Sequence, residues 1–489
     1  MSGVAGGADS GGAGTADSGG AGGAASGAGS GRTPSSSFWC GQALVDGELR
    51  SGVRVEADAA GYVTACEIGA AAREGDQILP GVSFPAASNA HSHAFHRILR
   101  GRTHAAGPGS FWTWREQMYA AAAVLTPDLY EQVASAVFTE MVVAGWSSVA
   151  EFHYLHHRPD GTRYAGEHAM ERALARAAVA AGIRLTLLDT CYLAGGFDTP
   201  LSARQRRFSD GGPEGWLDRL HSLRTAFASE FDAAQVSVGA ALHSVRGVPP
   251  EALAVLADRL DPDLPLHIHL SEQPAENEAC LTATGLTPTG LLDRYGLVTA
   301  RLSAVHATHL TEEDVSMLGR AGATVVLCPT TEADLADGIG PAFRLRDAGA
   351  RLALGTDQHA VVDPWQEMRA LEYGERLASG ERGRFSPAQL HHAVSDAGAR
   401  AQGRTAPGFG IGDACDLMSV DPASVRTAGS APEQLAMTAT AADVRTVVVA
   451  GRVLARDGRH TVLGDPASLL ADALAAADSR SASTAQGHP

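Results

Sequence analysis

Residues 86–95 read Ala-Ala-Ser-Asn-Ala-His-Ser-His-Ala-Phe, a short run of mainly small residues that ends in two histidines. Such a run is typical of a buried strand. Side chains at positions i and i+2 lie on one face of a strand, so His91 and His93 can reach the same metal ion. The pair alone is weak evidence, because HxH sequences are common and two partly buried structural histidines are the ordinary explanation.

The same pattern, a short apolar run that ends in a polar residue, recurs through the middle of the chain. The predicted strands are 86–93, 147–152, 184–190, 235–243, 264–269, 302–306, 324–328 and 351–356. Helical patterns alternate with them, among them 127–144, 167–181, 250–259 and 312–322. Thr126 and Thr311 are the expected N-caps of two of these helices. This alternation predicts an α/β fold with a (β/α)8 TIM-type barrel. A doubly wound sheet also alternates, but no GxGxxG follows the first strand.

The ends of these strands carry the polar residues, which is where barrel enzymes build their active sites. Beyond the first pair they are Glu151, His153, His243, His269, His306 and Asp357. Chance would not place metal-capable residues at the ends of so many strands, so the pattern favours the barrel. His267-Ile-His269 is a second HxH, in which His269 lies nearer the strand end and His267 is expected to be a core residue.

Three imidazoles and one carboxylate would suit a borderline divalent ion such as zinc. A single metal ion with an open position lowers the pKa of bound water to roughly 7. The sequence has neither HExxH nor PCxxC, which disfavours a zincin protease and a cytidine-deaminase type of site.

The composition excludes further classes. The 489 residues include 38 basic and 55 acidic side chains, a net charge of −17, which disfavours nucleic-acid and anionic-membrane partners. Every basic residue is arginine. We attribute this mainly to codon bias, but it excludes a P-loop lysine, a pyridoxal Schiff base and a carboxylated lysine that bridges two metals. It therefore favours one metal ion.

The six cysteines are scattered without a CxxC pair, which indicates free thiols in a reducing compartment. We find no signal-peptide pattern and no apolar run of roughly 20 residues. These observations lead us to expect a soluble cytoplasmic protein.

The two ends of the chain differ from its middle. We expect residues 1–36 to be a disordered Gly/Ala/Ser-rich tail. Short β patterns in 37–81 and 412–465 predict a small β-sandwich domain built from both ends, with the barrel, 82–411, inserted between them. Residues 466–489 are expected to form a C-terminal helix and a disordered tail, with tail-like composition from about residue 476.

Several segments together resemble the amidohydrolase superfamily, in its deaminase branch, and most closely the formimidoylglutamate deiminase family. They are NAHSHAF (89–95), FWTWREQMY (111–119), EFHY (151–154), HSVR (243–246), HIHLSEQ (267–273), HATH (306–309), PTTE (329–332), GTD (355–357) and LEY (371–373). HSH and GTD are common to many amidohydrolases, whereas FWTWREQMY and HSVR are far more specific. The resemblance covers about residues 38 to 465.

The resemblance implies hydrolysis of N-formimino-L-glutamate to N-formyl-L-glutamate and ammonia in histidine degradation. One zinc ion would be held by His91, His93, His269 and Asp357. Asp357 would also take a proton from the attacking water, Glu272 would shuttle it to the leaving nitrogen, and His306 would orient or deprotonate the water. His243 would hydrogen-bond the substrate or the intermediate.

The resemblance also implies that Arg246 and Arg115 bind the two carboxylates of the substrate, helped by Tyr154. His96 stands where this family usually has glutamine, so it is an expected substrate contact of altered chemistry. Asp334 and Asp337 are expected in a solvated loop. The other histidines are expected at the surface or in support of other site residues: His104, His156, His157, His391 and His392.

Two alternatives remain open. A related amidohydrolase could deaminate another formimino amino acid or an aminated purine, and an uncharged aromatic substrate would not need the two arginines. A non-catalytic barrel that binds a ligand is less favoured, because neither the ligand set nor Glu272 is lost. Dimers are frequent among such barrels, so a homodimer is one option for the assembly.

Overall fold

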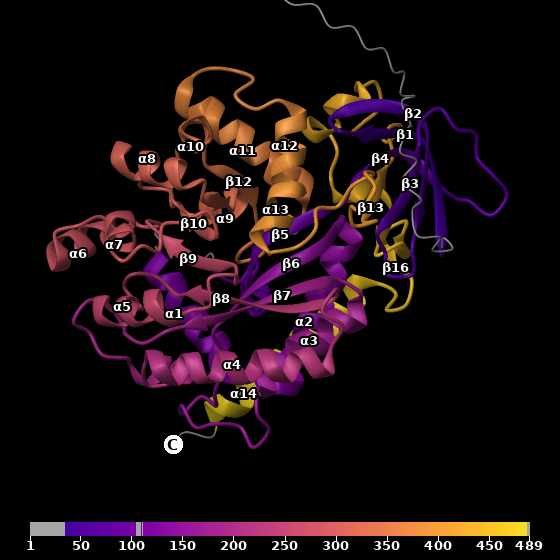
Figure 1. Ribbon diagram of the computed structural model, residues 1–489. Coiled ribbons are helices and arrows are strands. Elements are labelled where there is room, and N and C mark those ends of the chain that lie inside the picture. Colours follow the sequence, from indigo (N-terminus) through magenta and orange to yellow (C-terminus); the bar gives the residue numbers. More distant parts are fainter. Residues whose placement is uncertain (1–34, 104–108, 110, 487–489) are drawn as a thin grey trace, which may run out of the picture. The chain divides into compact units, whose positions relative to one another are not determined.

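The computed structural model describes residues 35–103, 109 and 111–486 (Figure 1). The tail predicted over residues 1–36 falls almost wholly outside the described residues, and Ser36 begins the first strand. Two eight-stranded sheets organise the described chain. The middle of the sequence supplies one of them and the two ends supply the other, as the sequence predicts.

The first sheet is the predicted barrel, with eight parallel strands in sequence order. They are β5 (Ala87–Ser92), β6 (Trp146–His153), β7 (Arg184–Cys191), β8 (Val236–Leu242), β9 (Leu266–Leu270), β10 (Leu302–His306), β11 (Thr324–Leu327) and β12 (Arg351–Leu354). Bonds between β5 and the chain after β12 close it: Thr356 N donates to His91 O and His93 N donates to Asp357 O, each at 3.0 Å. Closure therefore brings the first histidine pair next to the last aspartate.

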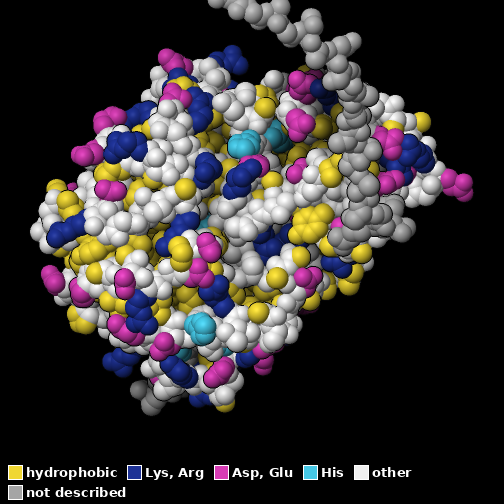
Figure 2. Space-filling view, viewed as in Figure 1, with side chains coloured by type: hydrophobic (Ala, Val, Ile, Leu, Met, Phe, Trp, Pro, Cys, Tyr) yellow, Lys and Arg dark blue, Asp and Glu magenta, His cyan; other side chains and the backbone are white. Residues whose placement is uncertain are grey.

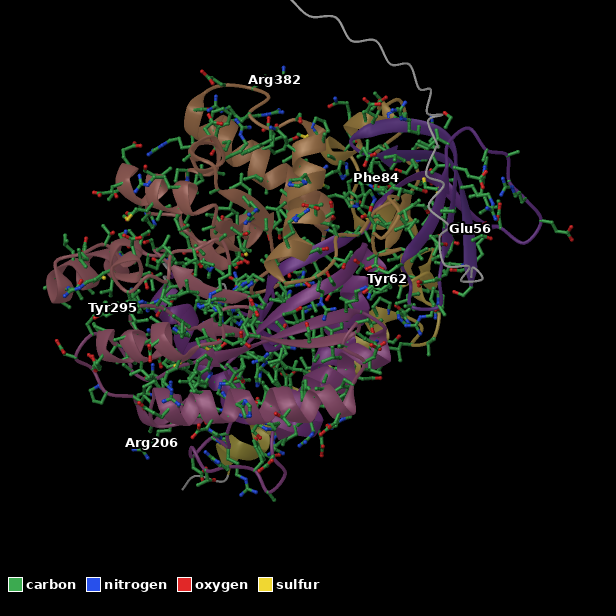
Figure 3. All side chains as sticks on the ribbon, viewed as in Figure 1. Glu56, Tyr62, Phe84, Arg206, Tyr295 and Arg382 are labelled. Carbon is green, nitrogen blue, oxygen red and sulfur yellow. The ribbon has the colours of Figure 1, made fainter. Side chains whose placement is uncertain are left out.

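Helices cover the outside of the barrel (Figure 1), and side chains fill the space between the strands and these helices (Figure 3). The α-helices of the described chain are α1 (Phe111–Val124), α2 (Pro127–Ala144), α3 (Ala169–Ala181), α4 (Pro213–Glu230), α5 (Pro250–Arg259), α6 (Pro274–Thr284), α7 (Pro288–Arg294), α8 (Glu312–Ala321), α9 (Pro329–Leu335), α10 (Ala342–Ala348), α11 (Pro364–Ser379), α12 (Pro387–Val394), α13 (Asp396–Ala401) and α14 (Pro466–Gln486). Short 3-10 helices are η1 (Ala94–Leu99), η2 (Ala203–Phe208), η3 (Pro432–Met437) and η4 (Ala441–Asp443). The side chains of Thr126 and Thr311 accept from Leu129 N and Asp314 N, which confirms both predicted N-caps.

The second sheet is mixed, with the order β16-β15-β14-β13-β4-β1-β2-β3. Its strands are β1 (Ser36–Val45), β2 (Glu48–Ala57), β3 (Val63–Glu67), β4 (Gln77–Pro85), β13 (Leu417–Val420), β14 (Val444–Val449), β15 (Arg452–Arg456) and β16 (Arg459–His460). β4 leads directly into β5, and Arg184 of β7 pairs with Asp416 at 2.9 Å. Phe84 packs edge-on against Trp365 and stacks on His391. These contacts fix the sheet against the barrel.

Helix α14 packs against α2 on the outside of the barrel (Figure 1). The tail predicted from about residue 476 is wrong up to Gln486, because the helix continues that far. Alanine has the highest helix propensity, and Leu470, Ala473 and Ala477 are buried, so composition alone was misleading here. No helix among the described residues is both long and apolar enough to cross a membrane.

Candidate active site

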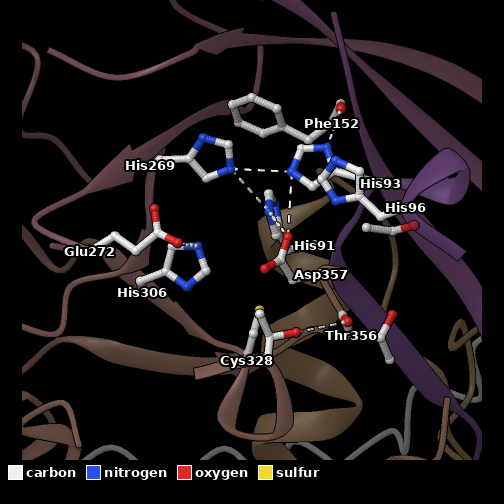
Figure 4. A network of polar contacts seen from close by, with 12 residues as sticks. His91, His93, His96, Phe152, His269, Glu272, His306, Cys328, Thr356 and Asp357 are labelled. Carbon is white, nitrogen blue, oxygen red and sulfur yellow. Dashed lines mark hydrogen bonds and ion pairs between the residues drawn. The ribbon is translucent and has the colours of Figure 1, made fainter. Parts of the chain in front are cut away.

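Four predicted metal ligands meet at the carboxyl ends of the barrel strands (Figure 4). His269 Nε2 lies 3.2 Å from His91 Nε2 and 3.3 Å from His93 Nε2. Asp357 Oδ1 lies 3.3 Å from His91 Nε2 and 3.4 Å from His93 Nε2. All four side chains are buried. Three imidazole nitrogens and one carboxylate oxygen that converge in this way match the donor set of a zinc site.

Backbone carbonyls hold two of these rings in place. The Nδ1 atom of His93 lies 2.8 Å from Phe152 O, and that of His269 lies 2.9 Å from His243 O. Each Nδ1 therefore carries the proton and leaves Nε2 free as a ligand. Burial lowers the pKa of His93 to about 3 and lowers the pKa of His91 and His269, so the rings stay neutral as metal ligands must.

The backbone at this end of the barrel is strained. Asp357 has φ 41° and His306 has φ 68°, in the left-handed region that side chains other than glycine rarely adopt. Residues in such conformations cluster at functional sites because the surrounding structure holds them there. The strain is consistent with a site that the barrel keeps in a fixed geometry.

Glu272 and His306 lie beside the ligands. Glu272 Oε1 is 3.8 Å from His306 Nε2, and His306 Nδ1 is 3.4 Å from Glu332 Oε1. Burial raises the pKa of Glu272 to about 7, whereas the neighbouring carboxylates raise the pKa of His306 to about 10. A carboxyl group that titrates near neutrality can both accept and donate a proton, which is what general acid–base work requires.

Asp337 was missed by sequence reasoning. The sequence predicts a solvated loop for it, but the side chain is buried and accepts a hydrogen bond from Gln273. Burial and the nearby charge of Glu272 raise its pKa to about 8. Asp334 is exposed as predicted, but it lies in helix α9 and not in a loop. The fold of the loop that follows α9 decides which aspartate faces inward, and no local pattern reveals this.

A cavity opens in front of the ligands, and the predicted substrate-binding residues line it. Its walls combine metal ligands with aromatic and charged groups: His93, His96, Phe111, Trp114, Arg115, Met118, Tyr119, Tyr154, Tyr192, Phe208, His243, Arg246, His269, Glu272, His306, Leu335 and Asp357. Mostly apolar walls with a few converging polar groups are typical of small-molecule sites. The barrel thus brings every predicted site residue except His91 to the surface of this cavity. His91 lies behind that surface, next to His269 and Asp357.

The two predicted carboxylate-binding arginines have different surroundings. Arg246 Nε lies 3.3 Å from Oε1 of Glu276, which has a fully buried side chain at the start of α6. The Arg115 guanidinium lies 4.5 Å from the Trp112 ring centre, and its Nε is buried without a hydrogen-bond partner in the described part of the chain. His96 Nε2 lies 3.1 Å from Tyr154 OH, and the His96 ring lies 4.5 Å, centre to centre, from that of His93.

A second group of potential ligands, His153, His156 and Glu171, lies away from this cavity. Glu171 already pairs with the Arg219 guanidinium at 3.2 Å, and His156 Nε2 contacts Thr190 O at 3.0 Å. We therefore assign these residues to a buried ionic network. The sequence analysis gave a surface position as one option for several other histidines. His156, His157 and His391 are buried, so that option is wrong for them, whereas His392 is exposed. His104, the remaining histidine of this set, lies outside the described residues.

The surface carries mixed charge. On the face in Figure 2, dark blue arginines and magenta carboxylates are interspersed. This distribution agrees with the sequence, which is acidic overall and has no run of basic residues.

Comparisons with known proteins agree with this geometry. A model of the amidohydrolase family matches residues 80–454. The chain is 38% identical over 439 residues to formimidoylglutamate deiminase of Pseudomonas aeruginosa, which covers 87% of this chain and 96% of that protein. It is 29% identical over 402 residues to 8-oxoguanine deaminase of the same organism, a match that covers 81% of this chain and 87% of that protein.

Solved structures share the architecture. An amidohydrolase from Brucella melitensis superposes with a TM-score of 0.83 at 32% identity, covering 90% of this chain and 99% of that one. A zinc-bound adenosine deaminase from Xanthomonas campestris superposes with a TM-score of 0.77 at 24% identity, covering 91% of this chain and 98% of that one. This second match shows a likeness of fold.

Proposed function

The chain belongs to the amidohydrolase family, and from this premise we propose that it hydrolyses N-formimidoyl-L-glutamate to N-formyl-L-glutamate and ammonia, a step of histidine degradation. The observation that carries the proposal is that Arg115 and Arg246 line the same cavity as the metal ligands. The 38% identical relative, which the chain spans almost completely, supports the same substrate. The substrate that we propose for this chain is thus a small molecule with two carboxylates and one amidine.

We assign one zinc ion per chain to His91, His93, His269 and Asp357. Four of the six distances between their donor atoms are 3.2 to 3.4 Å, which supports this assignment. When bound, the metal supplies a Lewis acid and a water molecule activated at neutral pH. The lack of any lysine leaves no carboxylated lysine to bridge a second ion in the barrel.

In this reaction, water adds to the formimidoyl carbon, which is electrophilic because the amidine is cationic at neutral pH. Asp357 accepts the proton that the attacking water loses. Glu272 delivers a proton to the terminal nitrogen, so that the C–N bond breaks and ammonia departs. His306 orients the water from the side opposite Glu332, and His243 donates a hydrogen bond to substrate.

Substrate binding follows from charge. Arg246 and Arg115 bind the two carboxylates, with Tyr154 and His96 as further hydrogen-bond partners. Glu276 neutralises one positive charge, so Arg115, Arg246 and Glu276 together carry a net charge of +1. N-Formimidoyl-L-glutamate, with two carboxylates and one amidinium, carries the complementary charge of about −1.

Domain organisation is a further part of the proposal. We assign residues 82–411 to a catalytic barrel and residues 37–81 with 412–465 to a small β domain. Arg184–Asp416 and Phe84–Trp365 are contacts that would hold the two together.

The direct test is to incubate the purified, zinc-loaded protein with N-formimidoyl-L-glutamate and to follow ammonia. Release at enzymatic rates supports the proposal. No release from protein that holds zinc would contradict it, and release from adenine or 8-oxoguanine instead would favour the purine alternative.

A further inference from the structure

Gln205 lies behind the cavity wall and connects two of its tyrosines. Its Nε2 donates to Tyr192 OH at 2.8 Å and to Tyr119 OH at 3.2 Å. Its Oε1 accepts from Ser202 N at 2.9 Å, in the capping box of η2. The amide is buried, and the Ser202 contact fixes which end carries the protons. Gln205 therefore acts only as a donor toward the two hydroxyls.

This arrangement leaves a tyrosine proton available to the cavity. Each hydroxyl accepts from Gln205 and still has its own O–H to donate. Because both hydroxyls accept from the same Gln205 nitrogen, a bond from one hydroxyl to the other would use at most one of the two protons. The remaining proton has no acceptor among the side chains of Gln205, Tyr119 and Tyr192. Both tyrosine rings line the cavity. An acceptor inside the cavity would satisfy it.

The two hydroxyls lie at the arginine end of the cavity. The Arg115 guanidinium is 5.7 Å from the Tyr119 ring centre. Tyr119 interacts electrostatically with Arg115 and Arg246, and Tyr192 interacts with Arg246. The Tyr192 ring also lies 4.1 Å, centre to centre, from His243, close to the ligands. Two cations and a hydroxyl donor together select an anionic acceptor such as a carboxylate.

We propose that Gln205 is a positioning residue that makes Tyr119 and Tyr192 donors to a substrate carboxylate, and so sets a preference for an anionic chain end over a neutral one. This inference deepens the proposed function and rests on it for the identity of the substrate. Gln205 itself does not line the cavity, so it acts through the tyrosines.

Reversing the direction of the hydrogen bonds tests this role. In Gln205→Glu the shape and the Ser202 contact are kept, but the introduced carboxylate accepts from both hydroxyls, so no proton faces the cavity. Gln205→Met is the matched control, because it removes all three contacts yet leaves the hydroxyls free to turn. The probe is glutarate, with butyrate as the monocarboxylate reference for binding to the metal, measured by calorimetry on zinc-loaded protein.

We expect Gln205→Glu to weaken glutarate binding about tenfold or more, and more than Gln205→Met does. With N-formimidoyl-L-glutamate, KM rises by a similar factor while kcat changes less. A role in packing alone predicts the opposite order, because Gln205→Met loses more contacts. Glutarate binding by Gln205→Glu within twofold of wild type, or weaker binding by Gln205→Met, would overturn the inference.

Tyr192→Phe keeps the test decisive if a Gln205 variant does not fold. It removes one hydroxyl without adding charge, and we expect it to weaken glutarate binding with an unchanged melting temperature. In the Gln205→Glu background it should add little further loss, since the two changes remove the same donor. Unchanged glutarate binding by Tyr192→Phe would contradict the inference. Glutarate binding without ammonia release would instead reject the proposed function alone.

Discussion

Arg246 and Glu276 form an ion pair in the wall of the cavity, with Arg246 Nε 3.3 Å from Glu276 Oε1 and the Glu276 side chain fully buried. Glu276 lies in the first turn of helix α6 and Arg246 follows strand β8, so two neighbouring barrel units create the pair. A buried carboxylate beside a guanidinium fixes its orientation and leaves other donor nitrogens for a ligand. This relationship supports Arg246 as a carboxylate-binding group.

Arg246→Met is therefore expected to raise KM for N-formimidoyl-L-glutamate roughly 10- to 100-fold, because a charge-assisted hydrogen bond is lost. kcat should fall less, since the arginine lies away from the reacting carbon. Glu276→Gln should raise KM less, because it loosens the arginine without removing it. Steady-state kinetics measure both, with the exposed Arg400→Met as control. An unchanged KM in Arg246→Met would favour an uncharged substrate.

Glu272→Gln is expected to lower kcat about 10²- to 10⁴-fold, the usual contribution of a general acid–base group. Metal content should not change, because Glu272 is not among the four ligands. Metal analysis of the same preparation separates this effect from loss of the ion. A variant that retains more than a tenth of the wild-type kcat would remove Glu272 from the mechanism.

Metal removal should abolish activity and lower stability. A chelator leaves three buried imidazoles and a carboxylate without their ion, and a ligand that binds only the folded state stabilises it. We expect the melting temperature to fall on chelation and to recover, together with activity, when zinc is added back. His269→Ala should bind less zinc and show a smaller response to the chelator. Full activity after verified metal loss would be incompatible with the proposed site.

Stability at low pH should depend on Asp443. Its carboxylate accepts from Arg426 and from Thr440 N, and these contacts hold its pKa at about 2, below the ordinary 3.8. A carboxyl with a lowered pKa contributes stability that is complete above the unfolded value and is lost as the pH falls through the folded one. Asp443→Asn should therefore lower the melting temperature at pH 6 and reduce its change between about pH 4 and 2. Equal melting curves for both proteins at pH 6 would show that the contacts contribute nothing.

The sequence predicts well what periodicity controls. Strand alternation places His91 and His93 on one face, and a parallel barrel brings β5, β9 and the end of β12 to one rim, so the pattern accounts for the meeting of the four predicted ligands. Their selection from the other polar strand ends came from the family resemblance. Tyr119, Gln205 and Asp337 could not be predicted in this way. They reach the site through α1, η2 and the loop after α9, whose packing depends on contacts between distant segments.

The central claim is tested most directly by identifying the products. The formimidoyl carbon has two C–N bonds, and the proposed mechanism breaks only the one to the terminal nitrogen. NMR of a completed reaction with N-formimidoyl-L-glutamate should show N-formyl-L-glutamate and one equivalent of ammonia. Formamide and glutamate would mean that the other bond breaks, and unreacted substrate beside zinc-loaded protein would mean that this compound is not the substrate; either result would contradict the account.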